Sequence, residues 1–505
     1  MSDDDRIRDG PRPDGGGSVD DGGSVDDGGS VDGGDVDDAD DGSARTESVA
    51  GVLQEAIARA FGGHDLAIVL ATLASIYGLF TLFVLVANDF ELTTNTINAI
   101  ASTLRLLTFF AASYAVLALA LNLHWGYTGL FNIGVAGFMA VGVYTMGLLS
   151  TPPDATSGMG LGLPLPVGVL GGMIAAGLVG LIAALPALRL EADYLAIVTL
   201  GLSEIIRLTM NSSQLSSWTV STFGFGTGGG SGLNLPVRPT DALFDDGAGE
   251  ALLTVLTGAG IRRSIVVDAA YTLVVVAFVV GVYWLLSRVG ASPFGRVLKA
   301  IRDDELVAQS LGKDTRLFKI KVFIVGCALM GLGGILWQGS YGYVNPNSFR
   351  PIVTFYVFVA VIIGGSGSNT GSIVGAILFV GLLFEGPRQF GGIVQNAMDL
   401  GSAPATFAGA VGPLFGLDPM PFLAYALENI SALQFVLLGV VLIVIMQRRP
   451  AGVLGHRTET AAAIDLGVRP EGNAPAARSG EEPTSRPDTT AAADHGGETG
   501  GDGDE

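Results

Sequence analysis

The chain has 505 residues with 27 basic and 48 acidic side chains, a formal net charge of −21, which argues against a nucleic-acid-binding protein. Its mean hydropathy is nevertheless +0.51, a value that a wholly disordered acidic chain does not reach. The charge is concentrated at the two ends: residues 1–50 carry 16 acidic and 4 basic side chains, and residues 456–505 carry 11 and 4. The body between them is therefore nearly neutral and apolar.

The two ends also lack the apolar residues that a folded core needs, and the first repeats Gly-Gly-Ser-Val-Asp-Asp with a period of six. We expect residues 1–60 and 456–505 to be disordered acidic tails around a folded domain at 61–450. Only four lysines stand beside 33 aspartates, a usage typical of proteins from salt-loving organisms. The single cysteine, Cys327, excludes an intrachain disulfide.

Ten apolar runs between the tails predict an all-α, polytopic integral membrane protein with about ten (eight to ten) transmembrane helices, because about 20 helical residues cross a bilayer. The runs lie at 66–87, 103–123, 127–149, 164–187, 194–210, 266–287, 322–340, 352–363, 371–386 and 432–447. The runs at 352–363 and 371–386 are short, and we treat them as two segments.

The distribution of basic residues predicts the orientation. The connection 288–321 carries eight basic and four acidic side chains, so the positive-inside rule puts it in the cytosol. Counting spans from there puts both termini in the cytosol and the loop 211–265 outside the cell. Arg262 and Arg263 then lie on the side where basic residues are disfavoured.

The segment 293–312 has the pattern of an amphipathic helix. Its apolar face is expected to contain Leu298, Ile301, Leu306, Ala308 and Leu311. Such a helix either inserts its apolar face into a groove on a partner protein or lies on the lipid surface, and periodicity alone favours neither.

The same segment resembles the cytoplasmic coupling loop of ABC-importer permeases of the branched-chain amino-acid family. The matching residues are Gly295, Arg296, Ala300, Arg302, Asp304, Glu305, Ala308 and Gly312. Four further stretches are similar to that family, in the same order along the chain: Leu121–Asn132, Tyr194–Leu208, Ile363–Ser368 and Arg449–Gly455. One departure is that the family commonly has a His after Asn-Phe-Gly, where this chain has Val135 after Asn132-Ile-Gly.

The resemblance implies a multi-pass plasma-membrane permease subunit of an ATP-binding cassette importer for branched-chain amino acids, and the composition adds a halophilic archaeal source. It implies cytosolic ATPase subunits that bind the eight residues above, a second permease subunit and an extracellular solute-binding protein. Urea or short-amide permeases share these motifs, so the cargo stays open. An ion-coupled secondary transporter is an alternative from another class.

Several polar or glycine residues in the spans are candidates for the translocation path: Asn122, Thr128, Asn132, Glu204, Gly364 and Gly365. A carboxylate in a span is costly unless paired, and Arg207 lies one turn beyond Glu204 on the same helix face. The pair either lines the path or locks neighbouring helices, and the amides either line a cavity or hydrogen-bond between helices. In the ion-coupled alternative, Glu204 would be the proton or cation site.

No enzyme activity is expected. The 505 residues contain no Gly-x-x-x-x-Gly-Lys-Ser/Thr motif, so ATP hydrolysis is assigned to a separate subunit. The four histidines, at 64, 124, 456 and 495, show no metal-ligand spacing, and no cofactor is expected.

Overall fold

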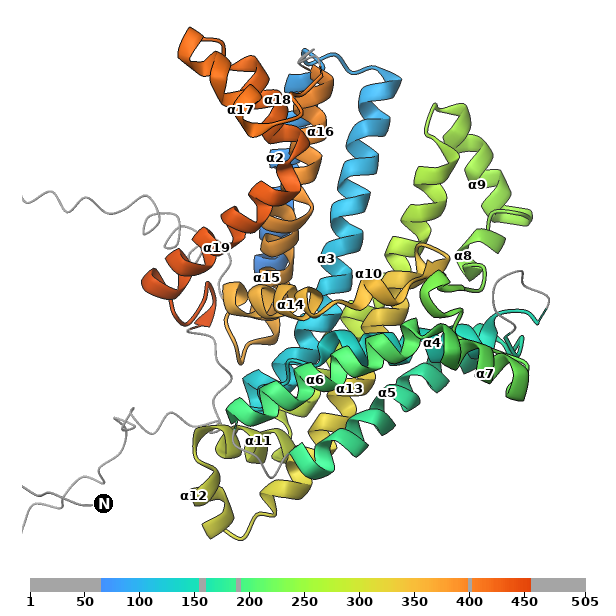
Figure 1. Ribbon diagram of the computed structural model, residues 1–505, viewed down its shortest axis with the longest axis vertical. Helices are drawn as coiled ribbons and strands as arrows, with labels where there is room; N and C mark the ends of the chain where they lie inside the picture. Colours follow the sequence, from blue (N-terminus) through green and yellow to red (C-terminus); the bar gives the residue numbers. More distant parts are fainter. Residues whose placement is uncertain (1–64, 154–159, 188–191, 398–401, 456–505) are drawn as a thin grey trace, which may run out of the picture. The chain divides into compact units, whose positions relative to one another are not determined.

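The computed structural model describes residues 65–153, 160–187, 192–397 and 402–455. These residues belong to one unit, Gly63–Glu505, and the predicted tails at 1–60 and 456–505 lie outside them. The described part is almost entirely helical (Figure 1), which confirms the all-α class.

The first half of the described chain contains α2 (Asp65–Ala87), α3 (Thr94–Thr128), α4 (Val135–Ser150), α5 (Leu165–Ala187), α6 (Ala192–Asn211), α7 (Ser213–Phe223), η1 (Gly229–Ser231), β1 (Leu233–Asn234), α8 (Pro239–Ala242) and α9 (Gly247–Gly258). The second half contains α10 (Arg263–Ala291), α11 (Pro293–Asp303), α12 (Glu305–Ser310), α13 (Thr315–Gly339), β2 (Tyr343–Val344), η2 (Pro346–Phe349), α14 (Pro351–Gly364), α15 (Asn369–Leu378), η3 (Phe379–Phe384), α16 (Gly386–Ala397), α17 (Phe407–Val411), η4 (Gly412–Gly416), α18 (Met420–Glu428) and α19 (Ile430–Arg448).

Six of the described helices are long and apolar enough to cross a membrane, or seven if α6 and α7, which meet at a 64° bend, form one span. All ten predicted runs fall on helices, but several of these helices are short: α4, α14 and the apolar part of α19 have 10–17 residues. The structure therefore does not confirm ten crossings. It does confirm a multi-pass architecture.

Helix α3 is the centre of the packing. It lies between α2 and α10 and also contacts α13, α14 and α15 (Figure 1). Ala-rich sequence lets these neighbours approach closely, and 89% of the most apolar window of α3 is buried. The Thr93 hydroxyl accepts from the Thr96 amide at the start of α3, and Gly129 ends it with a φ of 70°. The predicted boundary between the runs 103–123 and 127–149 is therefore wrong, because α3 continues to Thr128.

The predicted break between the runs at 352–363 and 371–386 is present as two packed helices, α14 and α15. Gly365 and Gly367, with φ of 105° and 88°, turn the chain between them in a conformation that side chains with a Cβ rarely adopt. The second segment is not half-length as expected, because α15 continues through the π-helical turn η3 into α16 and gives a 26-residue span, Asn369–Val394.

The region 211–265, expected to be an external loop, is folded rather than irregular. It contains α7, α8, α9 and strand β1, which pairs antiparallel with β2. Arg238 bridges Asp241 and Asp268 at 3.2 Å and 2.8 Å. Partial burial lowers the pKa of Arg238, but these two carboxylates outweigh burial and raise that pKa above its ordinary value.

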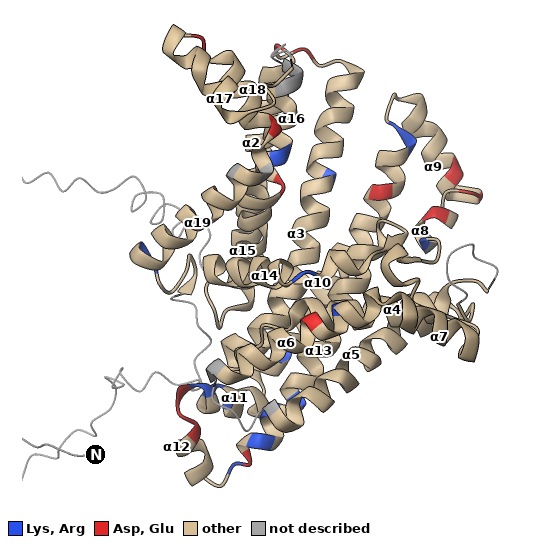
Figure 2. Cartoon of the chain, viewed as in Figure 1, with Lys and Arg blue, Asp and Glu red and all other residues tan. Residues whose placement is uncertain are grey.

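Lys and Arg residues gather around α11 and the start of α13, at one end of α3 (Figure 2). The basic excess of the 288–321 connection is thus a spatial cluster as well as a sequence feature. At the far end of α10, Arg263 pairs with Asp245 at 3.4 Å, so one of the two arginines on the disfavoured side has an acidic partner.

Candidate functional site

The segment 293–312 forms two short helices rather than the single amphipathic helix expected. Ser292 caps α11, and Asp304 interrupts the helix with extended backbone before its side chain accepts from the Val307 amide at 3.0 Å to cap α12. The break changes which residues share a face. Leu298, Ile301 and Ala308 are buried within the chain, whereas Leu306 and Leu311 are 73% and 72% exposed, so the five apolar residues do not form the single face expected.

The inner side of α11 is fixed to the end of α10. A Cβ at Gly295 would meet the carbonyl oxygens of Val289 and Gly290, so only glycine permits this approach. Lys299 is buried, donates to the Gly290 carbonyl at 3.1 Å and lies over the Tyr127 ring, 5.6 Å from its centre.

The outer side of α11 and α12 carries both charged and apolar groups. Arg296, Asp304 and Gly312 are exposed, and Ala300 is half-buried. Glu305 is held by a 2.5 Å ion pair to Lys319 of α13. Gly312 has a φ of 75° and open space around it, so it turns the chain from α12 toward α13. Of the eight predicted coupling residues, the structure brings all onto one two-helix element, which we call the coupling segment (293–312).

Arg302 attaches the coupling segment to the last turn of α3. Its Nη1 donates to the Gly126 carbonyl at 2.7 Å. The last carbonyls of a helix lack intrahelical partners, and a cation there also interacts favourably with the helix dipole. The coupling segment therefore contacts α3 at the point where α3 ends.

The last two turns of α3 contact the break between α14 and α15. The Asn122 Oδ1 accepts from the Gly367 amide at 2.7 Å, and its Nδ2 donates to Asn369 Oδ1 at 3.2 Å. Asn369 in turn donates to the Tyr127 hydroxyl at 2.8 Å. A Cβ at Gly126 would meet the Gly367 amide, so the close approach requires a glycine. Asn122 therefore bonds between helices, one of the two roles left open for it.

His124 joins this turn to α13. Its Nε2 lies 3.2 Å from the carbonyl oxygens of both Val322 and Phe323, so Nε2 must carry the proton. Its Nδ1 then accepts from the Asn132 amide at 3.1 Å. Thr128, also predicted as a path residue, donates its hydroxyl to the His124 carbonyl at 2.5 Å. Thr128 and Asn132 are buried within the helix packing.

The stretch Arg449–Gly455 closes the other side of the break. The amides of Val453 and Leu454 donate to the carbonyls of Ile363 and Gly364 at 2.8 Å and 3.0 Å. These are the terminal carbonyls of α14, which would otherwise be unpaired. Gly364 and Gly365 are buried beneath this stretch, so two of the five sequence motifs meet here.

Glu204 and Arg207 form the expected pair on α6, with N–O distances of 2.6 Å and 2.9 Å. Arg207 also donates to Asn347 Oδ1 at 3.0 Å, from the connection before α14. The Glu204 side chain is 36% exposed, on a helix otherwise covered with exposed apolar residues such as Ile197 and Ile205. An ion pair there is costly against lipid.

The structure thus separates the predicted site residues into two groups. Asn122, Thr128, Asn132 and the glycines of the break surround the last turn of α3, next to the coupling segment, whereas Glu204 lies apart on α6. Sequence reasoning missed Lys299, Asn369 and Asn347 as partners. None of the three carried a local signal, because the helical neighbours of Lys299 include the charged residues Arg296, Arg302 and Asp303.

Comparison with known proteins shows the family of the chain. Residues 102–446 match the family model described as branched-chain amino acid transport system / permease component. The chain is 34% identical over 272 residues to the high-affinity branched-chain amino acid transport system permease protein LivM of Escherichia coli strain K12, covering 53% of this chain and 60% of the relative. It is 25% identical over 371 residues to the probable branched-chain amino acid transport permease protein LivM of Methanocaldococcus jannaschii, covering 68% of this chain and 91% of that relative.

A shorter match is to the permease protein LivH of Escherichia coli strain K12, 30% identical over 87 residues, which cover 17% of this chain and 28% of the relative. The match to the bacterial LivM protein spans about 60% of that relative's length. No solved structure matches the chain. Since the family model covers most of the helical body, the chain belongs to the family of permease components of branched-chain amino acid transport systems.

Proposed function

We propose that this chain is the membrane-spanning permease subunit of an ATP-binding cassette importer for branched-chain amino acids. The single observation that carries the proposal is the coupling segment: its buried side is bonded to α3 through Arg302, and its outer side presents Leu306 and Leu311 to solvent. Exposed leucines on a charged two-helix element suit docking to a partner protein.

The partner that docks here is the ATPase subunit, since the chain has no phosphate-binding loop of its own. Movement of the ATPase would displace the coupling segment as a unit, because Lys299, Arg302 and Glu305 tie it to α10, α3 and α13. The last two turns of α3 pass this displacement to the break between α14 and α15 through Asn122. The break can then alternate between two packings.

The translocation path runs along the face of α6 that carries Glu204. A partly exposed intramembrane ion pair is unfavourable against hydrocarbon, so protein or water must cover it. A second permease subunit that faces α6 would provide both a cover and the other half of the path. The LivH relative named above is a permease protein of the same kind of system.

The orientation proposed from the basic cluster puts the coupling segment in the cytosol. Contacts at that end also involve both ends of the described chain. Asp65, the first residue of α2, accepts from Tyr283 near the end of α10, and Leu454 bonds to Gly364 beside the break. Both tails then leave from the cytosolic side, and an extracellular solute-binding protein would deliver the cargo at the opposite side, where α7–α9 lie.

The two other functions predict different behaviour. A urea permease of the same family would keep the coupling segment and change only the cargo. An ion-coupled carrier would need a carboxylate that exchanges its cation, whereas two hydrogen bonds to Arg207 hold Glu204. These bonds weigh against that role.

Reconstitution tests the proposal. The chain is co-expressed with the ATPases, second permease and binding protein of its transport system and placed in liposomes. We expect leucine uptake that requires ATP and that isoleucine and valine, but not urea, reduce by competition. Competition by urea would change the cargo alone, whereas uptake by the isolated chain under an ion gradient would overturn the importer assignment.

A further inference from the structure

An apolar groove separates α2 from α10. Both helices pack on α3 but make little contact with each other. The space between them is a cavity of about 380 Å³, whose floor is formed by Ala111, Ala112 and Ala115 of α3. Because alanine side chains are small, they leave space between the two helices that larger side chains would fill.

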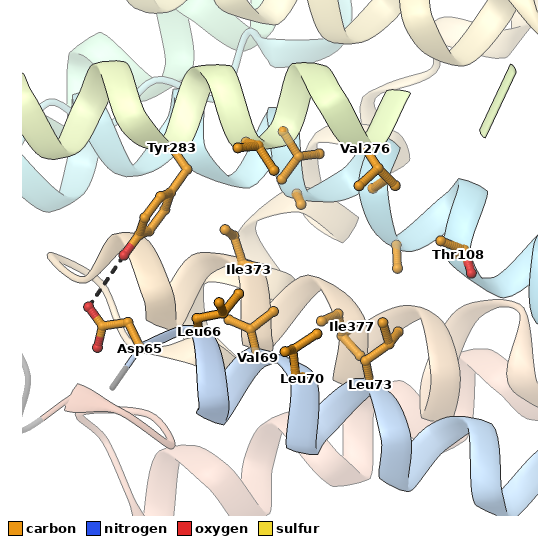
Figure 3. A pocket seen from close by; sticks show the side chains of 15 residues that line it. Asp65, Leu66, Val69, Leu70, Leu73, Thr108, Val276, Tyr283, Ile373 and Ile377 are labelled. Atoms are coloured by element: carbon orange, nitrogen blue, oxygen red, sulfur yellow. Dashed lines mark hydrogen bonds between the residues drawn. The ribbon is translucent and has the colours of Figure 1, made fainter. Parts of the chain in front are cut away.

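The walls of the groove are aliphatic. Leu66, Leu70 and Leu73 of α2 face Val276 of α10, and Ile373 and Ile377 of α15 also line the groove (Figure 3). Two polar contacts mark its ends. The Tyr283 hydroxyl bonds to Asp65 at 3.3 Å and to Thr370 at 3.2 Å at one end, and Tyr77 bonds to Thr108 at the other.

We propose that this groove is a binding site for one hydrocarbon chain of a membrane lipid, from the leaflet on the side of the coupling segment. Helices α2 and α10 are both long and apolar enough to cross the membrane, so the groove opens into the bilayer, where the available apolar molecule is a lipid chain.

The dimensions agree with one lipid chain. The two polar contacts engage α2 at Asp65 and Tyr77, twelve residues apart, which is about 18 Å of helix at 1.5 Å per residue. One leaflet contributes about 15 Å of hydrocarbon. A transmembrane helix would not fit in the groove. A helix with side chains is about 10–12 Å across, whereas the Tyr283 side chain of α10 alone reaches Asp65 of α2 across the gap (Figure 3).

The polar end lies where a lipid headgroup would lie. Tyr283 is eight residues before the end of α10, and α10 leads directly into the coupling segment. Tyrosines are enriched at this depth of membrane proteins, where the ring contacts hydrocarbon and the hydroxyl contacts headgroups. The lipid chain would therefore enter beside Tyr283 and extend toward Thr108. Only 17% of the most apolar window of α2 is buried in the protein, so the lipid chain would add contacts between α2 and the rest of the bundle.

Two matched substitutions on α2 test the site in the full chain. Leu70→Trp adds an indole inside the groove, whereas Leu82→Trp adds the same bulk outside it; the two leucines are 53% and 50% exposed, so neither change disturbs buried packing. The protein is purified in mild detergent, and bound phospholipid is counted by native mass spectrometry. We expect wild type and Leu82→Trp to retain one phospholipid more than Leu70→Trp.

Equal retention by wild type and both variants would overturn the proposal. A second measurement does not depend on any variant: a phosphatidylglycerol with a photoreactive diazirine in its acyl chain is incorporated into liposomes with the wild-type protein. We expect label concentrated on peptides of α2, α3 and α10 that line the groove. Label spread evenly over exposed apolar helices such as α5, or α2–α10 crosslinks between two copies of the chain, would contradict a lipid site.

Discussion

The Arg302 guanidinium donates a 2.7 Å hydrogen bond to the Gly126 carbonyl, and the amide of Gly367 lies close enough to Gly126 that a Cβ there would collide with it. One turn of α3 therefore contacts both the coupling segment and the break between α14 and α15. These contacts connect the coupling segment to the break directly through α3.

Arg302→Ala should uncouple ATP hydrolysis from transport. A hydrogen bond from a charged donor contributes about 1.5–3 kcal/mol, so we expect transport per ATP to fall about tenfold or more while the ATPase still co-purifies. Leucine uptake and ATPase rate are measured in the same liposomes. Arg316→Ala is the control, because Arg316 is an exposed cation at the start of α13. Equal loss in both variants would assign the effect to charge and not to the Gly126 contact.

Leu306→Asp with Leu311→Asp should abolish binding of the ATPase and leave the permease folded. Both side chains are more than 70% exposed, so the change removes no buried packing. The measurement is co-purification of the ATPase with the tagged chain, and the melting temperature reports folding. The control is Leu161→Asp. The Leu161 side chain is 53% exposed and lies in the connection between α4 and α5, away from the coupling segment. Undiminished co-purification would rule out these leucines as the docking surface.

Asn122→Ala should destabilise the break between α14 and α15. The substitution leaves the buried Gly367 amide and Asn369 side chain without their Asn122 partner, and an unpaired buried polar group costs about 1–3 kcal/mol. We expect a lower melting temperature and lower uptake. Asn122→Asp should recover part of the stability, because its carboxylate still accepts from the Gly367 amide. Alanine and aspartate variants of equal stability would mean that this amide bond contributes nothing.

These contacts show what could and could not be predicted from the sequence. The pairing of Glu204 with Arg207 follows from their spacing on one helix, and the break follows from two short apolar runs around glycines. Asn122 and Gly367 are 245 positions apart, and no local pattern indicates their contact. The division of 293–312 into two helices was missed because the pattern assumes one continuous helix, whereas Asp304 caps a new one.

Glu204→Ala should damage the protein more than the double substitution Glu204→Ala with Arg207→Ala. Removing only the carboxylate leaves Arg207 bonded to the neutral Asn347 side chain inside the membrane, and an uncompensated charge there is costly. Contacting residues typically show coupling energies of 0.5–3 kcal/mol. Folded yield and melting temperature are measured for wild type, both single variants and the double variant. Additive losses would show that the pair is not energetically coupled.

Uptake by the folded double variant then distinguishes the two roles of the pair. A pair that only locks helices predicts that uptake recovers along with stability. A pair that lines the path predicts that uptake stays low although stability recovers, because the polar wall of the path is gone.

Gly326→Ala should destabilise the junction between α3 and α13. A Cβ at Gly326 would collide with the His124 ring, which is held between the Asn132 amide and two carbonyls of α13 and stacks on Phe323. Because the ring cannot move away without losing these bonds, we expect the free energy of unfolding to fall by about 1–3 kcal/mol, the usual cost of overpacking.

Gly281→Ala is the matched control: Gly281 is also within a membrane-crossing helix, but a Cβ there would meet open space. There the better helix propensity of alanine should leave stability unchanged or slightly raised. Thermal unfolding of both variants in the same detergent is the measurement, and a Gly326→Ala protein as stable as Gly281→Ala would mean that His124 does not pack against α13 in this way.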